Sequence, residues 1–431
     1  MGSLVWFGNN LRVNDNTSLI KACSSDSVIG VFCFDPRWFQ EGDYGFVKMG
    51  KYRVKFLWET VKALQTALKA LNIPLLVHYE KPEVILPKLI TEHRITTVFF
   101  QKEWTRDEIK VCHAVIENAP DSTSFEADYD QFLFHPEDIP YSTTENIPDV
   151  FTAFRKKCEK YAQVRSALEV PEPKAMENLP ETPLPLPTLQ ELGISKFETD
   201  ARSAFPFHGG EDSANNRLHS YFWETHKLAY YKHTRNGLIG TDYSSKFSPW
   251  LANGALSPKT IYWEVRRFER DIRKNQDTYW LVFELIWRDY FKYISLKYKE
   301  KIFGLGGILQ KEYTWKNEEK AKQDWIGGTT TEPFVNANML ELAHTGWMSN
   351  RGRQNVASYW SKTLEQDWRI GAAYFESMLI DYDVHSNWGN WMYNSGVGND
   401  PRDRKFNINR QAEMYDPKGT FQKLWLQQSL F

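Results

Sequence analysis

Val28-Ile29-Gly30-Val31-Phe32-Cys33-Phe34 is an uninterrupted apolar run near the start of the chain. Runs of this length, rich in β-branched and aromatic residues, are typical of strands that are buried on both faces of a parallel sheet. Three more runs of this kind occur at 4–7, 75–79 and 97–100. The first hundred residues therefore predict a parallel sheet.

A long helix is predicted between the second and third of these strands. Seven apolar residues follow the three- and four-residue spacing of one helix face, namely Val54, Leu57, Trp58, Val61, Leu64, Leu68 and Leu71. Strands that alternate with helices indicate a doubly wound α/β domain, similar to a Rossmann fold.

Six prolines then interrupt the pattern within residues 171–187, where neither a regular helix nor a central strand is expected. We interpret this part as an extended interdomain connector. Beyond about residue 198, helical patterns such as 258–271 and 277–298 replace the strand signals, with loops at 304–307 and 327–331. We expect an α/β domain at 1–130, a connector at 131–197 and a helical domain at 198–431.

The composition excludes several classes of protein. The chain has 431 residues, of which 42% are hydrophobic and 25% charged, so it can bury large cores and is neither disordered nor collagen-like. The sequence has no apolar stretch of membrane-spanning length and no basic segment before a signal core, which predicts a cytoplasmic protein without a membrane partner. The four cysteines form no C-x-x-C pair, so no metal site is predicted.

Charge and aromatic residues are unevenly distributed. The net charge is −2, yet residues 225–301 contain fifteen Lys and Arg against eight Asp and Glu. A basic, aromatic segment can attract phosphate, although a solvated helix face has the same composition. The common nucleotide-phosphate loops and hydrolase motifs are absent from the sequence, so we expect the chemistry outside the α/β domain.

One predicted helix places a carboxylate among aromatic residues. Trp280, Glu284 and Trp287 are spaced i, i+4, i+7 and share one face. A carboxylate between two indoles is poorly solvated, which raises its pKa and suits it to donate a hydrogen bond or a proton. A structural ion pair between Glu284 and Arg288 is the alternative.

A second candidate segment is Tyr243-Ser244-Ser245-Lys246-Phe247-Ser248-Pro249-Trp250. Its hydroxyl groups precede a proline at the first turn of a predicted helix. The free N–H groups of such a terminus can hold a diphosphate, while ordinary helix capping explains the same pattern.

Two more segments place polar side chains at helical spacing. Asn350, Arg353 and Gln354 share one face, for which a solvated polar surface is the alternative. In the second segment the residues at one side are Asp383, Asn387 and Trp391. Two nearby aspartates could hold a metal, but no partners with ligand spacing accompany them.

Together these segments resemble the photolyase/cryptochrome flavoprotein family over nearly the whole chain. The matching stretches include 4–7, 10–16, 34–37, 149–156, 396–402 and 415–417. The segments 244–251 and 348–355 are most similar to the DASH branch of the family.

The resemblance implies a U-shaped FAD inside the helical domain. Its phosphates would be held by Tyr231 and the hydroxyls of Ser244 and Ser245, and the neighbouring Lys246, Phe247 and Ser248 are further implied cofactor contacts. Trp280 would line the pocket, and Asn350 and Arg353 would flank the flavin, with Arg353 paired to Asp381. Asp383 would accept a hydrogen bond from the isoalloxazine edge, and Asn387 would face N5 without being able to carry a proton to it.

The family's reaction is the light-driven splitting of cyclobutane pyrimidine dimers by an electron from excited reduced FAD. By resemblance, Glu284 would stabilise the dimer through a hydrogen bond, and Trp287 would stack against the flipped lesion. The tryptophans that match the family's photoreduction chain are Trp391, Trp368 and Trp315. The candidate phosphate contacts at the DNA-facing rim are Arg235, Arg351 and Arg404.

Two positions of the lesion pocket depart from photolyases that act on duplex DNA. Gln354 replaces a Met, and Tyr393 replaces a Trp that forms the second aromatic wall, as is typical of the DASH branch. A smaller wall offsets less of the few kcal/mol that base flipping costs. We therefore expect activity on dimers in single-stranded or looped DNA. The protein itself is expected to be a monomer. His385 stands where the DASH pattern has Cys.

The α/β domain is implied to hold a methenyltetrahydrofolate antenna, with Glu103 as the carboxylate that contacts it. The leading hypothesis is an enzyme, a deoxyribodipyrimidine photo-lyase of the DASH type, because a pure receptor does not need Glu284 and Trp287. The alternatives are a blue-light photoreceptor that uses the same FAD without repair, and a regulator that binds RNA or DNA.

Overall fold

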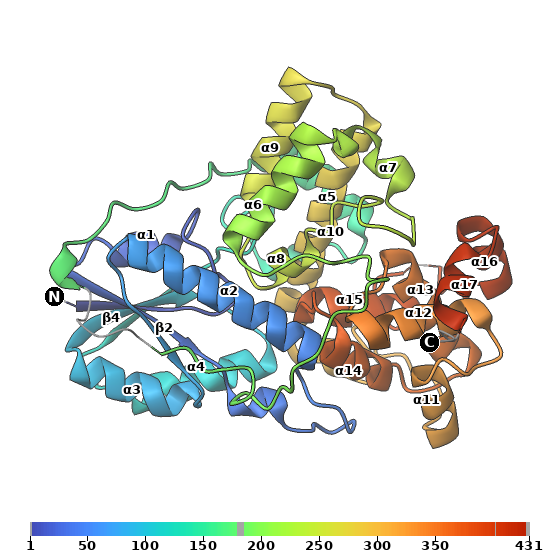
Figure 1. The fold of residues 1–431 in the computed structure, drawn as a ribbon, viewed down its shortest axis with the longest axis horizontal. Helices are drawn as coiled ribbons and strands as arrows, with labels where there is room; N and C mark the ends of the chain where they lie inside the picture. Colours follow the sequence, from blue (N-terminus) through green and yellow to red (C-terminus); the bar gives the residue numbers. More distant parts are fainter. Residues whose placement is uncertain (1, 179–184, 401, 428–431) are drawn as a thin grey trace.

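The computed structural model describes residues 2–178, 185–400 and 402–427. Figure 1 shows an α/β part drawn in blue and cyan beside a helical part drawn in yellow to red. The N-terminus lies at the outer end of the sheet, and the C-terminal end of the chain lies in the helical part (Figure 1).

The α/β part is built on one parallel sheet with the strand order β3-β2-β1-β4-β5. The strands are β1 (Gly2–Trp6), β2 (Ser27–Cys33), β3 (Leu75–His78), β4 (Ile95–Gln101) and β5 (Ser124–Asp128). The four predicted strands are confirmed. The sequence did not predict β5, because this edge strand is largely exposed and has no apolar run.

Helices cover both faces of this sheet (Figure 1). On one face lie α1 (Thr17–Ala22) and α2 (Lys51–Ala70), and on the other lie α3 (Pro82–Glu92) and α4 (Arg106–Asn118). The predicted apolar stripe belongs to α2, whose Val54, Val61 and Leu68 are fully buried. The doubly wound α/β fold is therefore confirmed.

The irregular connection between the two parts is shorter than the predicted connector at 131–197. That range contains α5 (Phe151–Tyr161), whose Phe154 and Cys158 are fully buried in the core of the helical part. The apolar side of α5 is short, so the sequence pattern gives no clear helix signal there. Pro180 and Pro183 of the proline-rich stretch lie outside the described residues.

The helical part confirms the predicted all-α class. Beyond residue 198 the described residues form no sheet, only an isolated bridge between Lys316 and Gln366. Its α-helices are α6 (Glu211–His219), α7 (Tyr231–Thr234), α8 (Ser248–Ala252), α9 (Pro258–Asp271), α10 (Gln276–Tyr298), α11 (Glu319–Ile326), α12 (Pro333–Thr345), α13 (Asn350–Ser358), α14 (Trp368–Met378), α15 (Val384–Ser395), α16 (Ile408–Tyr415) and α17 (Thr420–Leu426).

The two longest predictions in this part match α9 and α10 to within one residue. Helix α9 begins at Pro258 and is capped by Ser257, whose side chain accepts from the N–H of Lys259. Helix α10 begins after a capping box formed by Asn275 and Thr278. No helix among the described residues is both long enough and apolar enough to span a bilayer.

Close contacts join the two parts. Gly254 has φ +73°, and a Cβ atom there would lie 1.9 Å from the carbonyl oxygen of Asn9, so only glycine fits. The fully buried Asp15 accepts a hydrogen bond from Ser257 and forms an ion pair with Lys259 at 2.8 Å. These contacts fix the helical part against the loops that follow β1.

Candidate cofactor and substrate site

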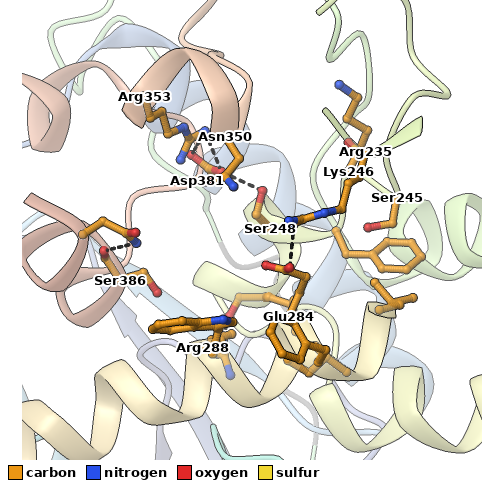
Figure 2. A pocket seen from close by; sticks show the side chains of 18 of the residues that line it. Arg235, Ser245, Lys246, Ser248, Glu284, Arg288, Asn350, Arg353, Asp381 and Ser386 are labelled. Carbon is orange, nitrogen blue, oxygen red and sulfur yellow. Dashed lines mark hydrogen bonds and ion pairs between the residues drawn. The ribbon is translucent and has the colours of Figure 1, made fainter. Parts of the chain in front are cut away.

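A cavity of about 380 Å³ lies inside the helical part. Its walls come from α10, from the loop and first turn at 243–248 and from α13, and Figure 2 shows the polar side chains that project into it. A second cavity of about 70 Å³ is lined in part by the same residues, including Asn350, Arg353 and Asp381. The combined space is of the size typical of small-molecule sites, roughly 300–1,000 Å³.

The loop before α8 is held open by a buried arginine. Arg217 of α6 donates to the carbonyl oxygens of Ser244 and Ser245 at 3.1 Å and pairs with Asp242 at 2.8 Å. Among the described residues no side chain caps the start of α8, the segment for which the sequence predicts a phosphate cradle. The Ser248 hydroxyl donates instead to Asp381 at 2.6 Å.

Lys246 presents a buried amino group without a hydrogen-bond partner to the wall of this cavity. Its Nζ atom has no such partner among the described residues and lies 3.2 Å from the ring centre of Tyr243 and 4.5 Å from that of Trp347. Burial lowers the pKa of Lys246, and burial raises the pKa of the nearby Glu341 to about 8. A ligand that brings phosphate oxygens would satisfy this amino group and favour its protonated form.

Arg353 and Asp381 form the ion pair that the family resemblance implies. One guanidinium nitrogen of Arg353 donates to both carboxylate oxygens of Asp381 at 2.9 Å, and the Arg353 Nε donates to the carbonyl of Met348 (Figure 2). Asp381 is only 3% exposed in its side chain. The pair links α13 to the loop before α15 and fixes that corner of the cavity.

Asp383 forms a second buried pair at the inner end of the site, which we call the floor. Its carboxylate accepts from Lys292 Nζ at 2.8 Å and from the Ser386 N–H at 2.8 Å, so it also caps α15. Burial by itself would raise the pKa of Asp383, but Lys292, His385 and Arg288 hold it well below its usual range. Asn387 follows one turn later and donates to the carbonyl of Ala372 at 3.0 Å.

Glu284 lies at the outer end of the cavity, which we call the mouth. Arg235 donates to it at 2.5 Å, and this pair replaces the alternative Glu284–Arg288 pair, because Arg288 donates to the carbonyls of Gln131 and Leu251 (Figure 2). Burial raises the pKa of Glu284, while Arg235 lowers it in part. A carboxyl group of this kind can donate a hydrogen bond.

Aromatic rings stand beside this carboxyl group. Trp287 stacks on Phe151 with ring centres 3.6 Å apart, and its edge meets Tyr393 at 6.1 Å with an interplanar angle of 87°. Trp287 and Tyr393 line the cavity together with Glu284. One face of Trp287 is therefore covered by the protein, while the mouth offers two rings at right angles.

Arginines and a glutamine complete the rim. Arg351 donates to Gln354 at 2.8 Å, and Arg404 donates to the hydroxyl of Tyr393 at 3.3 Å. The predicted substrate residues thus form neighbouring pairs, although Arg351 and Arg404 stand outside the cavity lining.

Two of the three predicted photoreduction tryptophans lie in consecutive helices, Trp368 in α14 and Trp391 in α15, and Trp315 lies in the loop before α11. Trp391 of α15 packs against Gly371 of α14, where a Cβ atom would lie 2.2 Å from the indole, and Trp368 begins α14 one turn earlier. The N–H of Asp367 donates to the carbonyl of Lys316 at 2.9 Å, which holds Trp315 beside this end of α14. Among the described residues no direct ring contact joins Trp391 to Trp368. The ring of Trp391 meets that of Trp325 edge to face, with ring centres 6.1 Å apart.

Glu103 lies outside this cavity, after β4. Its carboxylate accepts from Gln101 at 2.8 Å and from Asn9 at 3.3 Å, and burial raises its pKa to about 7. The next residue, Trp104, donates its indole N–H to Ser295 and stacks on His385 with ring centres 4.5 Å apart. The Ser295 hydroxyl also lies 2.7 Å from the Lys292 carbonyl and 2.7 Å from His385 Nδ1, so it links Trp104 and His385 in one hydrogen-bonded group.

Trp280 is a predicted FAD contact that lines neither of the two cavities. It stacks on Phe283 at 4.5 Å and lies under the ammonium of Lys232. Its ring also lies 5.7 Å from the guanidinium of Arg235, the partner of Glu284, in agreement with the single helical turn that separates Trp280 from Glu284.

Sequence reasoning missed several residues of the site. Lys292 had a detectable signal, because Glu284, Arg288 and Lys292 repeat every fourth residue along α10. Arg217 and Glu341 had none, since each reaches the site from a distant helix. Among the described residues no group of three His, Cys, Asp or Glu side chains is placed to hold a metal ion.

Comparison with known proteins gives consistent matches to both parts of the chain. The family model described as DNA photolyase matches residues 3–176, and the model described as FAD binding domain of DNA photolyase matches residues 280–429. A cryptochrome DASH of Synechocystis sp. is 44% identical over 428 residues, covering 98% of this chain and 87% of that protein. A cryptochrome DASH of Gloeobacter violaceus is 45% identical over 429 residues, covering 98% of this chain and 85% of that protein.

A solved structure shares the fold as a whole. The crystal structure of a Synechocystis sp. cryptochrome superposes with a TM-score of 0.94 at 42% sequence identity, and the match covers 99% of this chain and 89% of that chain.

Proposed function

Since the chain belongs to the photolyase/cryptochrome family, in the branch of the cryptochrome DASH proteins, we propose that it is a light-dependent enzyme that splits cyclobutane pyrimidine dimers, preferentially in single-stranded DNA. The family match supports a flavoprotein with an FAD-binding domain. The substrate and the strand preference are the part that we infer.

The residues of the cavity fit FAD. The amino group of Lys246 and the backbone N–H groups at the start of α8 would hold the diphosphate, and the Arg353–Asp381 pair would flank the flavin. Asp383 stays ionised because of Lys292, so it would accept a hydrogen bond from the cofactor and would not donate one. FAD, when bound and reduced, would supply the electron that light transfers to the dimer.

The observation that carries the proposal is the mouth of the cavity. Glu284 has a raised pKa and stands beside two perpendicular rings, Trp287 and Tyr393. A flipped pyrimidine pair would stack against these rings, and the carboxyl group would donate a hydrogen bond to a carbonyl oxygen that gains negative charge. The aromatic walls would also exclude water from that oxygen.

The preference for single strands follows from the stacking wall. Tyr393 offers less area than an indole, so it offsets less of the cost of taking a base pair apart. Arg351, Arg404 and Arg235 would hold the phosphates on either side of the lesion.

The decisive experiment illuminates reduced, FAD-loaded protein with one oligonucleotide that contains a single thymine dimer, offered as a single strand and as a duplex. We expect restored thymines in both, faster in the single strand, and none in the dark. An unchanged dimer in the lit single strand would refute the proposal.

The names of the relatives favour a second candidate, a blue-light receptor that uses the same flavin without repair. The two candidates differ at the mouth of the cavity. A receptor would respond to light equally well with Glu284→Ala, whereas the enzyme would lose repair.

We also propose that the α/β part holds a folate antenna at Glu103. The support is a partly buried carboxylate with a pKa raised to about 7, placed where β1 and β4 end side by side. Methenyltetrahydrofolate added to the protein should give near-ultraviolet absorption that Glu103→Ala removes, and a retained band in that variant would exclude this site.

A further inference from the structure

A buried group of polar side chains beside Trp368 takes no part in the function proposed above. The indole N–H of Trp388 donates to the hydroxyl of Tyr382 at 3.3 Å. The ring of Tyr382 lies against the guanidinium of Arg53 from α2, at 4.5 Å, and, after burial itself, the carboxylate of Glu376 from α14 is the anion that most raises the pKa of its hydroxyl. Tyr382 thus lies between an indole N–H and a carboxylate.

Trp388 is also in contact with the predicted photoreduction chain. Its ring meets that of Trp368 edge to face, with ring centres 5.7 Å apart and an interplanar angle of 78°. Trp388 is 6% exposed and Trp368 is fully buried. An electron can therefore pass between the two indoles without crossing solvent.

The indole N–H groups differ in what they face. An indole that has lost an electron becomes a strong acid at its N–H, so the positive charge is trapped only where that proton has a route to a base. Trp368 donates to the backbone carbonyl of Leu305, which is no base, and the buried N–H of Trp315 has no acceptor among the described residues. Of these three, only Trp388 faces a route to a carboxylate.

We propose that Trp388, Tyr382 and Glu376 form a proton-coupled branch of the photoreduction chain. The inference rests on the proposed function, in which bound oxidised FAD would supply the oxidant under light, Trp391 would donate to it, and Trp368 would refill Trp391.

In the branch reaction, one electron and the protons move only between these side chains. Trp388 gives one electron to oxidised Trp368, which returns to its closed-shell state. The N–H bond of Trp388 breaks as its proton passes to the Tyr382 oxygen, and the former O–H proton of Tyr382 passes to a carboxylate oxygen of Glu376. The products are a neutral Trp388 radical, an unchanged Tyr382 and a protonated Glu376.

The surrounding charges prepare Glu376 for this role. Burial raises its pKa, which makes it a better base than an exposed carboxylate, while Arg53 and Lys48 lower the pKa and Glu108 raises it. Arg53 is buried and lowers the pKa of Glu376, which favours the ionised carboxylate that the branch needs before light arrives. Since the carboxylate must start without a proton, the branch should fail as the pH falls through the raised pKa of Glu376.

The test follows oxidised tryptophan by time-resolved absorption after a blue flash on FAD-loaded protein. Glu376→Gln and Tyr382→Phe should each shorten the lifetime of the tryptophan radical several-fold, and Trp388→Phe should do the same. Tyr374→Phe is the matched control, because it removes a buried hydroxyl from the same helix as Glu376 and should change nothing.

Two further measurements, one by infrared spectroscopy and one by nuclear magnetic resonance, distinguish a proton relay from a purely structural role of these residues. The light-minus-dark infrared spectrum should show a newly protonated carboxyl band that is absent in Glu376→Gln. In flavin-free protein labelled with ¹³C-glutamate, the carboxyl signal assigned by Glu376→Gln should shift in Tyr382→Phe but not in Tyr374→Phe.

The inference is overturned if Glu376→Gln and Trp388→Phe fold, bind FAD and decay like the wild type, or if the carboxyl band survives in Glu376→Gln. A different result identifies failure of the proposed function. If Trp391→Phe photoreduces normally, the tryptophan chain itself is wrong, and the branch is overturned with it.

Discussion

The floor and the mouth of the cavity each hold one carboxylate paired with one cation, and both depend on helix α10. At the floor, Asp383 is paired with Lys292 and also accepts from a backbone N–H. At the mouth, Glu284 is paired with Arg235 alone. The pKa of Asp383 is lowered and that of Glu284 is raised, because several cations face the first and burial outweighs the single arginine at the second. The Asp383 carboxylate is thus a fixed hydrogen-bond acceptor, and the Glu284 carboxyl group is a potential hydrogen-bond donor.

The largest expected effect comes from removing the cation at the floor. Lys292→Met leaves Asp383 buried without its partner, so we expect the free energy of unfolding of the flavin-free protein to fall by about 3–5 kcal/mol. Urea unfolding followed by circular dichroism measures this change.

The matched control is Lys297→Met on the same helix, because Lys297 pairs with the half-exposed Asp149. This control should cost less than about 1 kcal/mol. Equal losses in the two variants would mean that the floor pair has no special role.

The next largest effect is expected at the mouth. Glu284→Ala should slow repair of a single-stranded dimer by about ten- to a hundredfold, which corresponds to a lost charged hydrogen bond of about 1.5–3 kcal/mol. Glu284→Gln keeps a donor and should lose less. The FAD content, read from the absorption spectrum, should stay the same in both, and a loss of FAD would show that Glu284 belongs to the cofactor site.

The pH dependence of stability should separate the two carboxylates by sign. The lowered pKa of Asp383 stabilises the folded protein above the unfolded value of about 3.9, and this stabilisation is lost as the pH falls. The raised pKa of Glu284 has the opposite effect, since stability falls as the pH rises above about 4.3.

The measurement compares the stability of Asp383→Asn and Glu284→Gln with that of the wild type across pH. The deficit of Asp383→Asn should shrink towards acid, and that of Glu284→Gln should shrink towards alkali, each by at most about 1.4 kcal/mol per pH unit. Slopes of the same sign would remove the contrast between floor and mouth.

The smallest expected effect is a gain at the mouth. Tyr393→Trp enlarges the second ring, and we expect the protein to bind a dimer in duplex DNA more tightly by no more than about 1 kcal/mol. The ratio of duplex to single-strand repair rates measures it. Tyr79→Trp, at an exposed position of the α/β part, is the control and should leave that ratio unchanged.

The sequence predicted most of the fold because buried strands and amphipathic helices leave periodic signals. It missed β5, whose exposed edge has no apolar run, and it missed α5, whose apolar side is short. Of the site, it predicted the residues that lie in contiguous motifs. It could not predict the partners, because the pairs Arg235–Glu284 and Lys292–Asp383 join residues that are 49 and 91 positions apart.

The stacking of Trp104 on His385 joins the strand end that bears Glu103 to the helix that follows Asp383. Because Trp104, His385 and Ser295 are all buried and in contact with one another, the α/β part and the helical part are packed more tightly here than loosely joined domains are. Heating should therefore melt the whole chain in one calorimetric endotherm. A substitution that destabilises one part would then also reduce the absorption of the chromophore bound in the other part.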